Sequence, residues 1–76
     1  MKVSILGTGC AKCEKLYTMT EQAIGELGLD VELEKVSGIQ DILAFGVMMT
    51  PALAVDGQVK VAGKVPSLTE IKEMLS

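Results

Sequence analysis

The spacing of apolar residues divides the chain into seven short segments of regular structure. Strands are predicted where apolar and β-branched residues follow one another or alternate, over residues 2–6, 31–36, 52–55 and 58–62. Helices are predicted where apolar residues recur every three or four positions, over residues 11–27, 38–46 and 67–75. The order is βαβαββα. Because a helix joins the first two strands, we expect them to be parallel.

The strand patterns also predict where each strand lies in the sheet. Residues 2–6 are apolar at nearly every position, which suits a central strand with both faces covered. Residues 31–36 alternate and place Val31 and Leu33 on one face, which is typical of an edge strand. Asp56-Gly57 is a preferred hairpin turn and makes the last two strands antiparallel. The predicted fold class is α/β, a four-stranded mixed sheet flanked by three helices.

Glycine and serine mark the predicted helix ends. Gly28 and Gly46 follow the last periodic positions of the first two helices, where glycine is the preferred residue. Ser37 and Ser67 are predicted to cap the second and third helices, the latter with a glutamate at capping-box spacing. Gly25 lies inside the first helix, where it is unfavourable. We therefore expect that the helix packs closely against a strand at this position.

Length and charge exclude several classes of protein. The 76 residues predict a single domain over 1–76, and 49% hydrophobic residues suffice for its core. The net charge is −3 and the lysines are scattered, which argues against binding to nucleic acid. No apolar run approaches the roughly 20 residues that span a bilayer, and no signal peptide is evident. We expect a cytoplasmic protein without a membrane partner.

Both cysteines, Cys10 and Cys13, follow Gly7-Thr8-Gly9 at the predicted start of the first helix. The unpaired N–H groups and the positive end of the helix dipole favour a Cys10 thiolate, and Lys12 adds a nearby positive charge. In a reducing cytoplasm this spacing is more typical of a catalytic or metal-binding pair than of a structural disulfide. We hypothesise that Cys10 attacks a disulfide and that Cys13, more buried, resolves the mixed disulfide.

Two thiolates at this spacing also suit copper(I). The stretch Gly-Thr-Gly-Cys-Ala-Lys-Cys is similar to the metal-binding loop of heavy-metal-associated domains. Those domains have the order βαββαβ and end in a strand, whereas helices are predicted here over 38–46 and 67–75. A copper(I) carrier is therefore the alternative function, and a non-catalytic binding module is a third. The redox hypothesis itself predicts no metal site.

Met48 and Met49 lie directly before Thr50-Pro51. We interpret the two methionines as core or rim packing, because methionine fills irregular gaps between apolar side chains. The alternative is an apolar lip that receives a partner protein.

The chain resembles the small archaeal and bacterial thioredoxin-like proteins in the order of its elements and in three motifs. These motifs are Cys-x-x-Cys after the first strand, Thr50-Pro51 before the hairpin, and Gly63 before Val65-Pro66-Ser67. The resemblance covers nearly the whole chain. It implies a thioredoxin fold, a cis Thr50–Pro51 bond facing the cysteines and reduction of protein disulfides. We further expect a monomer, an unidentified reductase as its partner, and no cofactor beyond a redox-active Cys10–Cys13 disulfide. The site residues so implied are Cys10, Cys13, Gly9, Ala11, Lys12, Thr50, Pro51 and Gly63.

The chain departs from the better-known relatives at two places. Thioredoxins have an aromatic residue before the first cysteine and a proline between the two, where this chain has Gly9 and Ala11-Lys12. Dithiol glutaredoxins have acidic residues near the last helix that hold glutathione, and residues 62–67 contain none. Glutathione is therefore not the expected direct reductant.

Overall fold

The computed structural model describes residues 1–9 and 11–75, and these form four strands and three helices. The strands are β1 (Lys2–Leu6), β2 (Glu32–Val36), β3 (Ala52–Val55) and β4 (Gln58–Ala62). The helices are α1 (Ala11–Leu27), α2 (Ile39–Ala44) and α3 (Leu68–Leu75). The sheet has the strand order β2-β1-β3-β4, with β1 parallel to β2 and antiparallel to β3. The predicted α/β fold class and element order are confirmed.

The positions of β1 and β2 in the sheet are those that their patterns predict. β1 lies between β2 and β3, and its last four residues are buried. β2 is an edge strand whose residues are exposed or half-buried. Val31 and Leu33 pack against the same apolar core. The pairing runs from Lys2 opposite Glu32 to Leu6 opposite Val36, so both strands end at one end of the sheet.

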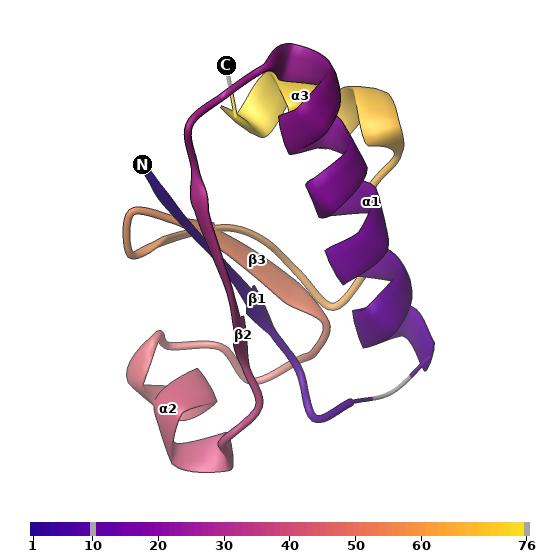
Figure 1. The fold of residues 1–76 in the computed structure, drawn as a ribbon. Coiled ribbons are helices and arrows are strands. Elements are labelled where there is room, and N and C mark those ends of the chain that lie inside the picture. The colour runs from indigo at the N-terminus through magenta and orange to yellow at the C-terminus, as the bar shows by residue number, and fades with distance from the viewer. Residues whose placement is uncertain (10, 76) are drawn as a thin grey trace.

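The two faces of the sheet are covered unequally (Figure 1). α1 and α3 cover one face, and the buried residues there are Val3, Ile5, Leu16, Ala23, Leu53, Val55, Val61, Ile71 and Leu75. α2 covers the other face, where the buried residues are Leu6, Ile42, Val47, Ala52 and Ala54. Because α2 has only six residues, it covers the sheet where β1 ends and β3 begins, and no helix of residues 1–9 and 11–75 covers the other end of that face.

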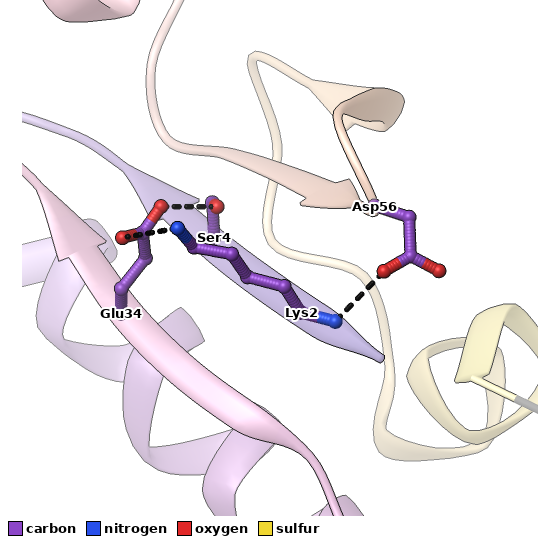
Figure 2. Close-up of polar contacts among 4 residues, drawn as sticks. All are labelled: Lys2, Ser4, Glu34 and Asp56. Atoms are coloured by element: carbon purple, nitrogen blue, oxygen red, sulfur yellow. Dashed lines mark hydrogen bonds and ion pairs between the residues drawn. The ribbon is translucent and has the colours of Figure 1, made fainter.

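Polar side chains occupy the α2 face of the sheet beyond the helix. Ser4 is 3% exposed and lies two positions from Leu6, so the two side chains share a face. Its hydroxyl donates to Glu34 Oε2 at 2.7 Å, and Lys2 Nζ lies 3.4 Å from Glu34 Oε1 (Figure 2). The backbone N–H of Lys2 donates to Asp56 Oδ1 at 2.8 Å and so ties β1 to the hairpin turn. We call these four residues the polar network.

The two shorter helices begin differently. The backbone N–H of Glu70 donates to Ser67 Oγ at 3.2 Å, and that of Ser67 donates to Glu70 Oε1 at 3.1 Å. These bonds confirm the capping box of α3. α2 is shorter than the predicted 38–46, and its N-cap is Gly38, which makes no side-chain cap. The prediction that Ser37 caps α2 is wrong, because the helix begins at Ile39 and its N-cap position is therefore Gly38.

Glycines end α1 and α2 as predicted, with φ of 66° at Gly28 and 80° at Gly46. The explanation offered for Gly25 is wrong. Apart from the helix's own nearby backbone, no atom in the described part of the chain lies within 4 Å of the position that a Cβ would take there, because Gly25 is on the exposed side of α1. Within residues 1–9 and 11–75, no helix is long and apolar enough to cross a membrane.

Candidate functional site

The candidate site is built where β1 ends and α1 begins. The backbone N–H of Gly7 donates to the carbonyl of Val36 at 2.9 Å, which extends the pairing of β1 with β2 by one residue. Gly9 has a φ of +91°, a backbone conformation that favours glycine because a Cβ is unfavourable there. The next residue, Cys10, lies outside the described residues, and so do its predicted position and role. α1 begins at Ala11.

Cys13 lies in the first turn of α1 and is 4% exposed. It lines a pocket of about 230 Å³ together with Ile5, Gly7, Gly9, Glu14, Lys35 and Ser37. The glycines add no side chain to the wall of this pocket, so the first turn of α1 lies directly against the end of β1. Ala11 and Lys12, also in this turn, are both exposed.

An ion pair stands at the edge of this pocket. Lys35 Nζ lies 2.8 Å from Glu14 Oε1 and 4.8 Å from the centre of the Tyr17 ring. The hydrogen bond to the Glu14 carboxylate raises the pKa of Lys35, so the ammonium stays charged. The sequence alone did not indicate this pair. The strand register explains the pair: Lys35 pairs with Ile5, and partners in a sheet share a face, so Lys35 lies on the face of the sheet that α1 covers.

Thr50, Pro51 and Gly63 lie at the same end of the sheet. The Thr50–Pro51 peptide bond is cis, and Pro51 is fully buried directly before β3. Ala52, the next residue, pairs with Leu6 at the end of β1. The backbone N–H of Gly63 donates to the carbonyl of Pro51 at 2.9 Å. The site residues proposed from the two halves of the chain therefore lie at the same end of the sheet, apart from Cys10, which the structure does not describe.

Known proteins resemble this chain over its whole length. The thioredoxin domain family matches residues 1–76. The chain belongs to the thioredoxin family. It is 47% identical over 76 residues to a thioredoxin of Methanothermobacter thermautotrophicus, across 100% of this chain and 99% of that protein. It is 42% identical over 73 residues to a thioredoxin of Methanocaldococcus jannaschii, across 96% of this chain and 84% of that protein.

A second, smaller pocket of this thioredoxin-family chain lies on the α2 side of the site. Its volume is about 130 Å³, and its lining residues are Thr8, Ile39, Ile42, Leu43, Val47, Met48 and Thr50. Ile39, Leu43 and Met48 are 66%, 56% and 92% exposed. We call these three residues the apolar rim. Thr8 lies in the loop 7–9, so this loop borders both pockets.

The prediction that Met48 packs within the core or at its border is wrong, because this side chain is 92% exposed. α2 ends at Ala44, and the connector that follows buries Val47 instead, which turns Met48 into solvent. Met49 is 66% exposed but lies against Gly63. A Cβ placed on Gly63 would be 3.3 Å from both the Cβ and the Cε atom of Met49.

Among residues 1–9 and 11–75, no group of three or more histidine, cysteine, aspartate or glutamate side chains could hold a metal ion. The copper(I) alternative needs only two thiolates, one of which is Cys10, outside these residues.

Proposed function

We propose that this chain is a thiol–disulfide oxidoreductase that reduces disulfide bonds in proteins through Cys10 and Cys13. The observation that carries the proposal is the burial of Cys13 in the first turn of α1, beside a pocket and three positions after Cys10. A helix start favours the thiolate form of a cysteine, and thiolates are the attacking species in disulfide exchange. Family membership supports the proposal, since two similar archaeal proteins are named thioredoxin.

The proposed reaction transfers two electrons from the dithiol to the substrate. The Cys10 thiolate attacks one sulfur of the substrate disulfide, so a Cys10–substrate bond forms, the substrate S–S bond breaks and one substrate thiol leaves. Cys13 then loses its proton to solvent and attacks the Cys10 sulfur. A Cys10–Cys13 bond forms, and the second substrate thiol leaves. The substrate is reduced to two thiols, and the chain is oxidised to an internal disulfide.

The neighbouring residues are proposed to shape this exchange. Pro51 has no backbone N–H, and the exposed Thr50 beside it offers its backbone to an extended substrate strand. The Thr50 side chain is a poor ligand for soft metals, which keeps metals away from the thiols. Gly9, Ala11 and Gly63 are small and leave room for the substrate. Lys12 adds positive charge near the Cys10 thiolate.

The partners follow from the surface around the site. We propose that the apolar rim contacts protein substrates, because three exposed apolar side chains in one patch are typical of an interaction surface. The oxidised chain returns to the dithiol form by exchange with a reductase that carries its own dithiol. Residues 62–67 have no acidic side chain to hold glutathione, so glutathione is not this donor. We propose a cytoplasmic monomer without a metal or organic cofactor.

Substrate trapping tests the proposal. In lysate, Cys13→Ser should accumulate mixed disulfides through Cys10 that dithiothreitol releases, whereas the Cys10→Ser, Cys13→Ser double variant should accumulate none. Cys10→Ser alone should lose reduction of a model protein disulfide. Wild-type activity in Cys10→Ser would refute the assignment.

Thiol counting separates this function from copper carriage. Mild oxidant should convert two titratable thiols to none, and reductant should restore them, in protein free of metal. Stoichiometric copper in the purified protein, together with failure of the thiols to join, would favour the carrier.

A further inference from the structure

Gly7 lies unusually close to Cys13. A Cβ placed on Gly7 would be 2.2 Å from Cys13 Sγ and 2.9 Å from Cys13 Cβ. Both distances are shorter than real side-chain carbons tolerate, since carbon atoms in contact are about 3.5–4.0 Å apart. The lack of a side chain at position 7 is therefore what lets Cys13 occupy its present place.

Neither partner can relieve this contact by a small local change. The Gly7 backbone is held by its hydrogen bond to the carbonyl of Val36. A change of χ1 would move the Cys13 sulfur away, but Cys13 Cβ is fixed by the helix backbone and would still be too close. An added methyl group at position 7 must therefore push the first turn of α1 away from the end of β1.

The two glycines of the loop are needed for different reasons. Gly9 has a positive φ, and outside its chain neighbours no atom of residues 1–9 and 11–75 lies within 4 Å of the position that its Cβ would take. Gly7 has no positive φ, and among the described residues the atoms nearest to the position of its Cβ all belong to Cys13.

We infer that Gly7 is a positioning residue for Cys13: the bare backbone at position 7 lets the first turn of α1 close onto the end of β1 and fixes where the Cys13 sulfur lies. This inference rests on the proposed function, in which Cys13 must reach a mixed disulfide on Cys10. With α1 displaced, the Cys10–Cys13 disulfide forms less favourably, and the mixed disulfide persists longer.

The first measurement tests the contact without reference to redox chemistry. Urea unfolding is compared for wild type, Gly7→Ala, Cys13→Gly and the double variant, all in the reduced form. Gly7→Ala should lower the unfolding midpoint, and the loss should be much smaller when Cys13→Gly has removed both Sγ and Cβ. Gly25→Ala is the matched control, since a Cβ at Gly25 would meet no described side chain within 4 Å, and its midpoint should equal or exceed that of wild type.

The second measurement tests the consequence for exchange. Wild type, Gly7→Ala and Gly25→Ala are equilibrated with dithiothreitol buffers of graded oxidation, and the internal disulfide is quantified by mass spectrometry. Gly7→Ala should shift the equilibrium toward the dithiol by about threefold or more, whereas Gly25→Ala should match wild type. A merely structural role for Gly7 would lower the unfolding midpoint without moving this equilibrium.

Each outcome has a definite meaning. Equal loss of stability with and without Cys13→Gly, or an unchanged dithiol equilibrium in folded Gly7→Ala, overturns the inference and leaves the proposed function intact. If Gly7→Ala does not fold, recovery of folding in the double variant supports the contact, and failure of that recovery overturns it. If the wild-type thiols do not join at all, the proposed function fails and the inference fails with it.

Discussion

The two faces of the sheet are held by different forces. On the α1/α3 face, two helices bury a continuous apolar core that includes Leu16 and Ile71, each with no exposed surface. On the α2 face, one short helix covers a smaller core around Ile42, and the polar network lies beyond it. The stability of the α1/α3 face therefore depends on apolar burial, whereas that of the α2 face depends partly on the Glu34 carboxylate and the Ser4 hydroxyl.

This difference suggests that the two faces contribute differently, one to stability and the other to recognition of a partner. The α1/α3 face carries the larger set of buried apolar residues, and these hold the helix that contains Cys13, where the proposed chemistry needs rigidity. The α2 face leaves apolar side chains exposed beside the site, where a partner can contact them. We expect core substitutions on the first face to alter stability most, and substitutions on the outer surface of α2 to alter recognition most.

The largest expected effect comes from the dense core. Leu16→Ala should lower the free energy of unfolding by about 3 kcal/mol, because it opens a cavity between α1 and the sheet. Ile42→Ala should cost about 2 kcal/mol, because the smaller core beneath α2 can partly collapse. Urea unfolding at pH 7 measures both. Equal costs, or a larger cost for Ile42→Ala, would contradict the comparison of the two faces.

The next effect concerns recognition. Leu43→Ser removes an apolar side chain that is 56% exposed, so we expect little change in stability. The ratio of kcat/KM on a protein disulfide to that on a small aromatic disulfide should fall about fivefold, equivalent to about 1 kcal/mol of lost apolar contact. Leu27→Ser, at the far end of α1, is the control and should leave the ratio unchanged. An unchanged ratio in Leu43→Ser would remove the apolar rim from the proposed substrate surface.

The α1/α3 face of the sheet could be predicted from the sequence more accurately than the α2 face. The apolar stripe of α1, including Leu16 and Ala23, and the central place of β1 follow from periodicity, because a helix or strand has one geometry to satisfy. α2 was predicted too long, and Met48 was predicted to pack, because a short helix and a connector can bury any of several apolar side chains. Local periodicity cannot choose among them.

The candidate site was predicted in its residue types but not in its contacts. Cys13, Pro51 and Gly63 are recognisable from motifs and resemblance, and the structure brings them to one end of the sheet. The contact of Gly7 with Cys13 depends on how closely α1 approaches β1, and the ion pair of Lys35 with Glu14 depends on strand register. Both are tertiary facts that no short stretch of sequence contains.

The polar network predicts an acid-sensitive contribution on the α2 face. The Ser4 hydroxyl, and to a smaller extent Lys2, lower the pKa of the Glu34 carboxyl. A carboxyl whose pKa is lower in the folded chain stabilises that state above its unfolded value of 4.5, and this stabilisation is lost as the pH falls through the folded value. Glu34→Gln should therefore lower the urea midpoint at pH 7 and have a smaller effect at pH 3.

The matched control for this experiment is Glu32→Gln, an exposed residue on the same strand that takes no part in the polar network. Its effect on the midpoint should be smaller than that of Glu34→Gln at pH 7. A loss in Glu34→Gln that is the same at both pH values would mean that shape, and not charge, is what Glu34 contributes.

The last predictions concern the starts of the two short helices, and the smallest effect is expected at the start of α2. Ser67→Ala should lower the free energy of unfolding by about 1 kcal/mol, because it removes the side-chain acceptor for the Glu70 N–H at the start of α3.

Gly38→Ser should instead raise the free energy of unfolding by about 0.3 kcal/mol, because Gly38 is extended, with φ −72° and ψ 129°, and a serine there can cap α2. Its Cβ would lie 2.9 Å from Asp41 Oδ2, the mobile end of a side chain that can turn away. Gly38→Ala has the same Cβ without the hydroxyl and should give no gain in the urea midpoint. A gain in Gly38→Ala equal to that in Gly38→Ser would show that the missing side-chain cap is not what limits α2.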